Sequence, residues 1–105
     1  MGSGKVFVTQ FTPKGDYTEA EKWGNVCFIT KHEHRPEPTS REINMAVELD
    51  IKKFRSLYIQ GIDFILVSPS GVVNIAVGAN LPCGMHKILK WDNRSKTYRL
   101  HKLWI

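Results

Sequence analysis

The sequence predicts an α/β protein with a Rossmann-like, mostly parallel sheet, flanking helices and a C-terminal antiparallel β-hairpin. Short β-branched and aromatic runs alternate with segments of helical spacing, which is typical of strands joined by helical crossovers. The last two strand-like runs are joined by a polar turn, which is typical of a hairpin. A chain of 105 residues accommodates one modest core, so we expect a single domain over 1–105.

The N-terminal part of the chain predicts a strand, a helix and a second strand. Lys5–Thr12 is rich in β-branched and aromatic residues, which favour a strand. A capping box at Asp16–Glu19 and a glycine stop at Gly24 predict a helix of about two turns. The apolar run Val26–Thr30 predicts a strand that is covered on both faces.

The middle of the chain predicts an exposed connection followed by the longest helix. Lys31–Pro38 contains two prolines, which exclude regular structure there. A second capping box at Thr39–Glu42 opens a helix that ends at Gly61. Its apolar stripe has helical spacing and predicts packing against a sheet; the stripe consists of Ile43, Val47, Ile51, Phe54 and Tyr58.

A strand–turn–helix unit and a hairpin complete the predicted fold. Phe64–Val67 predicts a buried strand, Ser68–Gly71 a tight turn, and Val72–Ala79 a short helix. Regular structure is then interrupted by a Pro- and Gly-containing segment, and two strands with a turn between them form the hairpin. These last segments are Leu81–Gly84, His86–Trp91, Asp92–Lys96 and Thr97–Trp104.

The carboxyl ends of the predicted parallel strands are the expected ligand-binding edge. Hydroxyls and backbone N–H groups at the start of the helix after the third strand favour a phosphate. The candidate phosphate-binding residues are Gln10, Thr12, Lys14, Ser68, Ser70, Gly71 and Asn74, and the loop after the second strand adds His32, His34 and Arg35 as ligand or acid–base groups. Ser68–Gly71 matches neither a Walker loop nor a dinucleotide motif, so an ordinary strand–helix turn is the alternative.

The sequence does not indicate catalytic or metal chemistry. It contains no nucleophile elbow, no paired carboxylates and no zinc-protease motif, so we expect no catalytic residues and no cofactor. A non-enzymatic role is favoured over an enzymatic one, which the sequence leaves open. His32 and His34 lack a third ligand at a suitable spacing, so we expect no metal. Cys27 is interpreted as a small buried apolar residue and Cys83 as a loop thiol.

Net charge is concentrated at the C-terminal end. The chain carries a net charge of +5 and has neither a signal peptide nor a long apolar run, so we expect a cytoplasmic protein that does not enter membranes. Up to Met85 the basic and acidic residues cancel, whereas six Lys and Arg residues follow against Asp92 alone.

The charged end offers an alternative function in nucleic-acid binding. The hairpin combines basic residues with aromatic side chains on which bases can stack. The candidates are Lys87, Lys90, Trp91, Arg94, Lys96, Arg99 and Lys102, with Tyr98 and Trp104 as further stacking surfaces. Lysines that protect a sheet edge from aggregation are a simpler interpretation of the same pattern. A protein-binding regulatory or viral factor that docks through the hairpin edge is the third alternative.

Residues 62–104 resemble the C-terminal part of the SAVED and CARF families, which are Rossmann-like sensors of cyclic nucleotides and oligonucleotides in prokaryotic immunity. The resemblance lies in Ile65–Ser70, Ala76–Asn80 and Ile88–Trp91 with Tyr98. The last hairpin also resembles that of small phage proteins.

The resemblance implies a cyclic nucleotide or cyclic oligonucleotide as ligand. It also implies a homodimer, because ligands of CARF-like domains lie across a two-fold interface. Since no effector domain is present in the sequence, the implied role is to sense, sequester or degrade a signal nucleotide in phage–host defence.

Overall fold

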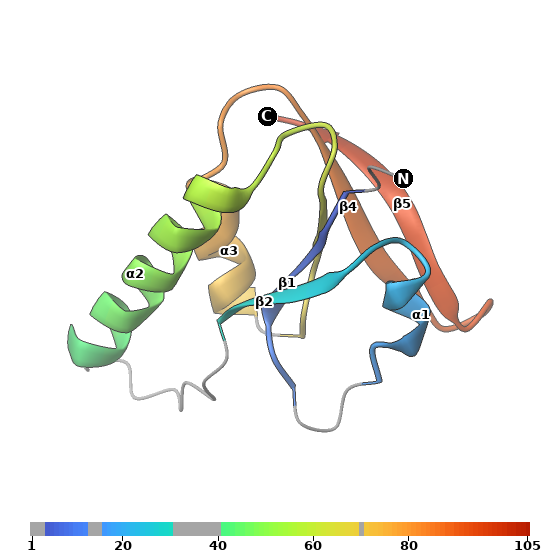
Figure 1. The fold of residues 1–105 in the computed structure, drawn as a ribbon. Helices are drawn as coiled ribbons and strands as arrows, with labels where there is room; N and C mark the ends of the chain where they lie inside the picture. The colour runs from blue at the N-terminus through green and yellow to red at the C-terminus, as the bar shows by residue number, and fades with distance from the viewer. Residues whose placement is uncertain (1–3, 13–15, 31–40, 70) are drawn as a thin grey trace.

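The computed structural model describes residues 4–12, 16–30, 41–69 and 71–105, with the backbone alone for 41–44 (Figure 1). Its elements follow the predicted order of strands and helices, with ends that differ by one or two residues in most cases. They are β1 (Val6–Gln10), α1 (Thr18–Glu21), β2 (Val26–Thr30), α2 (Arg41–Leu57), β3 (Phe64–Leu66), α3 (Gly71–Ala79), β4 (Met85–Asp92) and β5 (Thr97–Trp104).

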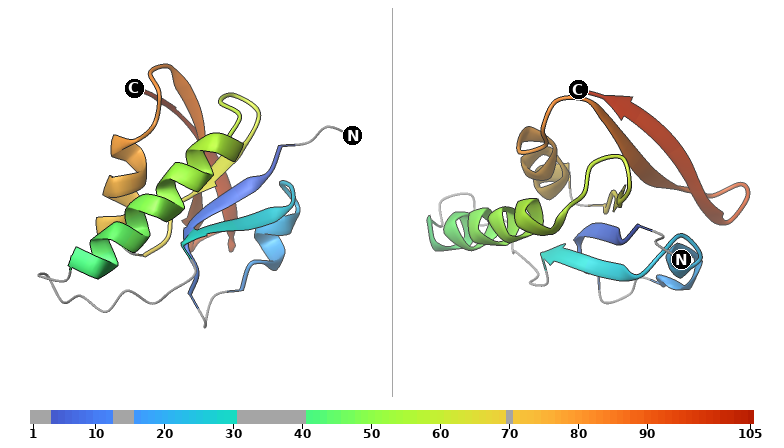
Figure 2. Two further views of the ribbon diagram at one scale, coloured as in Figure 1. Left: turned by 60° about the vertical axis from the view of Figure 1, so that its left-hand side comes forward. Right: turned by 45° about the horizontal axis from the view of Figure 1, so that its top comes forward.

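The five strands form one sheet in the order β2-β1-β3-β4-β5. β1 pairs in parallel with both β2 and β3, and β3 pairs in parallel with β4. β5 runs antiparallel to β4 and forms the edge opposite β2 (Figure 2). The predicted α/β class, the mostly parallel sheet and the terminal hairpin are therefore confirmed.

Alternating side chains of the strands divide the core into two layers. Phe7 and Ile65 face α2 and α3, whereas Val6 and Val8 face α1. Figure 1 shows α2 and α3 on one side of the sheet and α1 on the other. The first cluster consists of Phe7, Ile29, Ile51, Phe54, Ile65, Val73 and Val77, and the second of Val6, Val8, Ala20, Leu66, Leu89 and Tyr98.

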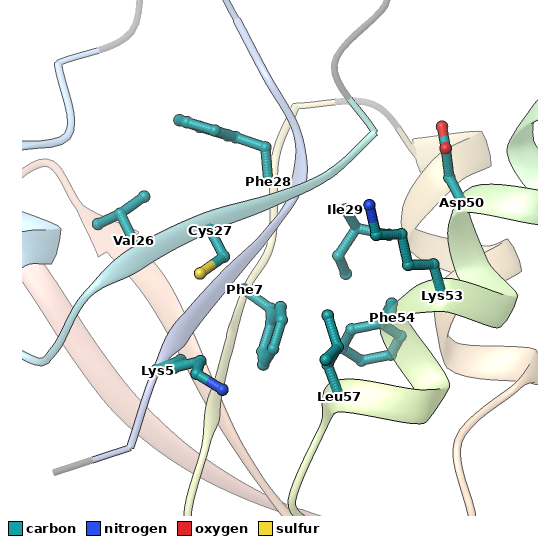
Figure 3. Close-up of a pocket in the computed structure, with 10 residues that line it drawn as sticks. All are labelled: Lys5, Phe7, Val26, Cys27, Phe28, Ile29, Asp50, Lys53, Phe54 and Leu57. Carbon is teal, nitrogen blue, oxygen red and sulfur yellow. The ribbon is translucent and has the colours of Figure 1, made fainter.

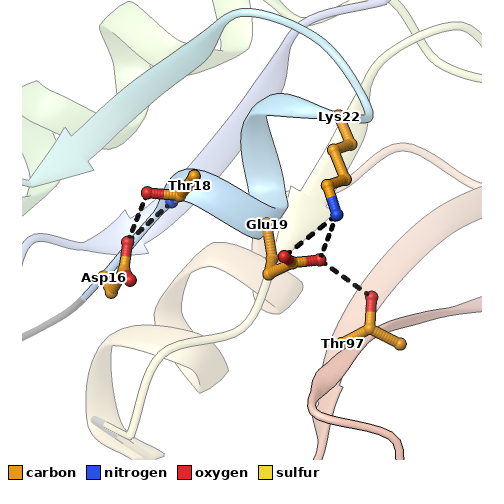
Figure 4. A network of polar contacts seen from close by, with 5 residues as sticks. All are labelled: Asp16, Thr18, Glu19, Lys22 and Thr97. Atoms are coloured by element: carbon orange, nitrogen blue, oxygen red, sulfur yellow. Dashed lines mark hydrogen bonds and ion pairs between the residues drawn. The ribbon is translucent and has the colours of Figure 1, made fainter.

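The predicted two-turn helix after β1 is wrong in length, since α1 has four residues. Asp16 does not begin the helix as its N-cap; its carboxylate accepts hydrogen bonds from the hydroxyl and the backbone N–H of Thr18, at 2.6 and 2.9 Å, which lower the pKa of Asp16. Glu19 pairs with Lys22 at 2.9 Å and lies 3.4 Å from the Thr97 hydroxyl of β5 (Figure 4).

Glycines explain the early end of α1. The backbone turns sharply after the helix, because the N–H groups of Trp23 and Gly24 bond to carbonyls three residues earlier. A Cβ atom at Gly24 would overlap the carbonyl oxygen of Gly4, and a Cβ atom at Gly4 would overlap that of Ile62. The amino ends of β1, β2 and β3 are thus in backbone contact, and this contact needs glycine.

Two buried polar groups tie the end of α2 to the sheet. The Asp63 carboxylate, 2% exposed, accepts hydrogen bonds from the backbone N–H groups of Lys5 and Ile59, both at 2.8 Å. The Tyr58 hydroxyl lies 2.5 Å from Nδ1 of His86, whose Nε2 lies 2.7 Å from the carbonyl oxygen of Pro82. Burial, with a smaller contribution from Asp63, raises the pKa of Tyr58 to about 12, so its hydroxyl keeps the proton at neutral pH.

We expect Gly4→Ala to destabilise the protein by about 1–3 kcal/mol, because the new methyl group overlaps backbone rather than a flexible side chain. Gly78→Ala is the matched control, since nothing lies within 4 Å of a Cβ atom at this position of α3. That control should stabilise the protein by up to about 1 kcal/mol. Urea unfolding of both variants measures the two effects, and a Gly4→Ala variant as stable as Gly78→Ala contradicts the described backbone contact.

Candidate functional site

A pocket of about 470 Å³ opens where β1, β3 and β4 end, on the face of the sheet that α1 covers. This volume lies within the usual range for small-molecule sites. The floor is apolar and the walls are aromatic. The lining residues are Val8, Thr12, Asp16, Tyr17, Leu66, Val67, Ser68, Pro69, Lys90, Trp91 and Tyr98.

Aromatic rings from two distant parts of the chain form the walls. Trp91 and Tyr98 are directly opposite each other on β4 and β5, with ring centroids 5.0 Å apart and planes at 71°. Tyr17 stands at the start of α1, and its hydroxyl accepts a hydrogen bond from the backbone N–H of Thr12 at 3.0 Å. Burial, followed by the proximity of Tyr17 and Asp16, raises the pKa of Tyr98, so the Tyr98 hydroxyl keeps its proton at neutral pH.

A buried hydroxyl network fixes the turn beside the pocket. The Thr9 hydroxyl lies 2.6 Å from Oδ1 of Asn74 and 2.9 Å from Oγ of Ser68. It also accepts a hydrogen bond from the Ser68 backbone N–H at 3.0 Å, and Nδ2 of Asn74 donates to the Ser68 carbonyl at 2.7 Å. The Thr30 hydroxyl donates to the Thr9 carbonyl at 2.9 Å, which extends the network to β2.

The structure brings together part of the predicted phosphate rim. Thr12 and Ser68 line the pocket, and Gly71 begins α3 at the exposed surface. Gln10 ends β1 opposite Thr30, whereas Asn74 points its amide at the backbone of Ser68. The other predicted residues, Lys14, Ser70, His32, His34 and Arg35, lie outside the described residues.

The basic residues of the hairpin do not share one face. Lys87 is directly opposite Lys102, and Lys90 is opposite Arg99. Because side chains alternate along a strand, these two pairs lie on opposite faces of the hairpin. Lys90 lines the pocket, and the Lys87 ammonium lies 5.1 Å from the centre of the Phe64 ring.

The hairpin turn carries the remaining predicted cations and a compensating carboxylate. Arg94 and Lys96 lie in the turn, and Lys96 has a positive φ of 56°. Asp92 pairs with Arg99 at 2.6 Å and accepts hydrogen bonds from the Arg94 backbone and the Ser95 hydroxyl, both at 3.0 Å. These hydrogen bonds, the Arg94 backbone first, lower the pKa of Asp92.

Sequence reasoning missed Asp16, Tyr17 and Pro69 as pocket residues, and it assigned Trp91 and Tyr98 to a different site. The capping-box pattern at Asp16–Glu19 predicted that Tyr17 lies at the start of a helix, and it indicated no contact for the Tyr17 side chain.

Within 4–12, 16–30, 41–69 and 71–105, no group of three His, Cys, Asp or Glu side chains could hold a metal ion. None of the described helices is long and apolar enough to cross a bilayer.

The fold and the pocket define a small α/β protein with an aromatic pocket at the carboxyl edge of its sheet. The family model described as Phage Pam3 gp32-like protein matches residues 4–105, so the chain belongs to this phage protein family. The predicted resemblance to small phage proteins is thereby confirmed. No curated protein and no solved structure matches the chain, and the resemblance to SAVED and CARF proteins stays a prediction.

We expect Thr9→Val to destabilise the protein by about 1–3 kcal/mol, because it keeps the shape of the side chain but removes a hydrogen-bond partner of both Ser68 and Asn74. Thr97→Val is the control, since its hydroxyl has a long contact of 3.4 Å to Glu19. We expect this change to stay within about 0.5 kcal/mol. Chemical denaturation provides both values, and equal stability of the two variants would show that the buried network is not important.

Proposed function

We propose that the protein binds a nucleotide in the pocket at the carboxyl ends of β1, β3 and β4. The observation that carries the proposal is the meeting of three aromatic side chains, Tyr17, Trp91 and Tyr98, in one pocket. Lys90 lines the edge of this pocket, and its side chain alternates with that of Trp91 and so lies toward the face of the sheet that carries α3. Aromatic faces bind the flat base of a nucleotide, and an ammonium group binds its phosphate. The pocket thus provides one group for each chemically different part of the ligand.

The topology supports this position for a ligand. β1 leads through α1 to β2 on one side, whereas β3 leads through α3 to β4 on the other. The connections therefore diverge between β1 and β3, and ligands of Rossmann-like sheets bind at such a divergence. The pocket contains residues of both strands, Val8 and Leu66, on its floor.

The phosphate is expected between Lys90 and the first turn of α3. α3 has nine residues and no acidic side chain in its first turn, so its positive dipole end is not neutralised there. Ser68 lines the pocket immediately before this helix. Asp16, on the other side of the pocket, is placed to accept a hydrogen bond from an exocyclic amino group of a base.

Binding or sequestration is a better match to the pocket than turnover. Asp16 is the one carboxylate among the described lining residues, and no histidine lines the pocket within that part of the chain. Membership of a phage protein family supports a role in phage–host defence, in which the ligand is a cyclic nucleotide or cyclic oligonucleotide. A homodimer with the ligand at its interface belongs to the same proposal, and light scattering with and without ligand measures it.

The proposal is tested by calorimetry with mononucleotides, cyclic dinucleotides and cyclic trinucleotides. We expect Lys90→Gln to weaken binding about tenfold, which corresponds to one charge-assisted hydrogen bond. Lys102→Gln removes the same charge from β5 outside the pocket and should leave the affinity unchanged. Nucleosides, which lack phosphate, should bind both variants and the wild type equally.

Two results would contradict nucleotide binding at this site. One is the absence of heat and of thermal stabilisation with every nucleotide at millimolar concentration. The other is an equal loss of affinity in Lys90→Gln and Lys102→Gln, which would indicate attraction by overall charge rather than binding in the pocket.

Nucleic-acid binding by the hairpin is the second candidate function. The observation that favours it is the direct opposition of like charges in two cross-strand pairs, Lys87 with Lys102 and Lys90 with Arg99. Like charges opposite each other cost stability, and a polyanion would offset this cost. Trp104, 75% exposed, offers a stacking surface at the end of β5.

If the hairpin binds nucleic acid, the affinity for single-stranded DNA should fall steeply as salt rises, because phosphate contacts release counterions. Combining Lys90→Glu with Arg99→Glu should abolish binding. Fluorescence anisotropy with a labelled oligonucleotide measures both effects. A flat salt response, or unchanged binding by the double variant, counts against this second function.

A further inference from the structure

A second pocket, of about 500 Å³, lies on the other face of the sheet, between β2 and α2 (Figure 3). Phe7, Cys27 and Ile29 reach it from the sheet, and Phe54 and Leu57 from the helix. Phe7 and Phe54 meet edge to face, with ring centroids 5.1 Å apart. Val26, Phe28, Lys5, Asp50 and Lys53 complete the lining.

The position of β2 leaves this apolar surface partly open. β2 is an edge strand, and no other strand among the described residues continues the sheet beyond it. Leu57 on the rim is 49% exposed, and Cys27 is half-buried. An apolar surface that remains accessible in a pocket favours an apolar ligand, because burial removes that surface from water.

The charged groups of the pocket are two ammonium groups and one carboxylate. Figure 3 shows the Lys5 amine beside Phe7 and the Lys53 amine extending toward Ile29, whereas the Asp50 carboxylate points away from Phe7 and Cys27. Within the described residues, neither lysine forms an ion pair. The pocket therefore combines an apolar floor with two ammonium groups that form no ion pair within the described residues and with one carboxylate that points away from the floor.

We propose that this pocket binds an amphipathic carboxylate of the fatty-acid type. The hydrocarbon chain lies along Cys27 and Leu57, the accessible apolar side chains above the buried floor of Phe7, Ile29 and Phe54. The carboxylate pairs with Lys5 or Lys53. A cationic amphiphile is disfavoured by the two ammonium groups, and a neutral one leaves them without a partner. The site is separate from the nucleotide pocket, because Phe7 and Val8 point to opposite faces of β1.

The two cysteines of the chain allow a test within one molecule. Cys27 lines the pocket, whereas Cys83 is exposed in the connection between α3 and β4. Alkylation of each thiol by iodoacetamide is followed by mass spectrometry, with and without laurate below its micelle-forming concentration. At about ten times its dissociation constant, laurate should slow alkylation of Cys27 roughly tenfold. The rate at Cys83 should not change.

Charge variants separate the carboxylate contact from simple apolar binding. Lys5→Gln combined with Lys53→Gln should abolish the protection of Cys27, and so should replacing laurate by 1-dodecanol in the wild type. Lys52→Gln combined with Lys96→Gln is the matched control, because it removes two exposed charges outside the pocket and should retain full protection. Phosphatidylglycerol vesicles replace laurate in a further arm, which distinguishes a membrane lipid from a free acid.

Several outcomes overturn the proposal. One is that laurate fails to protect Cys27 from alkylation, and another is that it slows alkylation of Cys27 and Cys83 equally. Protection of Cys27 by laurate in the variant that combines Lys5→Gln with Lys53→Gln also contradicts the proposal. So does protection by vesicles without protection by laurate. None of them bears on the nucleotide pocket, where the effect of Lys90→Gln is measured separately.

Discussion

The hydroxyl group of Thr9 is the contact on which the carboxyl edge of the sheet depends. Thr9 is 1% exposed, and its hydroxyl contacts both Ser68 in the β3–α3 turn and Asn74 in α3. The end of β1, the turn after β3 and the first part of α3 are therefore held as one unit. A buried polar group that loses its partner costs more than an average hydrogen bond contributes. Ser68 belongs to this unit and lines the pocket, so the network fixes one side of the pocket.

The order of the elements was predictable because it depends on local patterns. The stripe that includes Ile51 and Phe54 predicted both the helix and its buried face, and these side chains are 3% and 2% exposed. The length of α1 was not predictable, because its end depends on contact between the backbones of Gly24 and Gly4. The strand order likewise depends on partners that are distant in sequence.

The candidate site was predictable only in part, for a physical reason. Ser68 was found because strand ends in parallel sheets meet at one edge. Asn74 was expected to face a ligand, but its amide nitrogen donates a hydrogen bond to the Ser68 carbonyl. Asn and Ser at a turn can either bind a ligand or hydrogen-bond to the local backbone, and the sequence does not distinguish the two. Trp91 and Tyr98 meet Tyr17 through the register of β4 with β5 and the position of α1, which no local pattern encodes.

The excess positive charge of the molecule lies at one edge of its sheet. The net charge of +5 arises from residues after Met85, and these form an outer strand pair of a molecule that measures 40 × 30 × 23 Å. Salt at physiological concentration screens charges beyond about 8 Å. An ion near the part of the molecule before Met85 therefore meets almost no net charge, because basic and acidic residues cancel there. An approaching anion therefore exerts a torque that turns β4 and β5 toward it before contact. The positions of the charged residues therefore set the orientation in which the protein first meets an anionic partner. The rate of association with such a partner rises as the salt concentration falls.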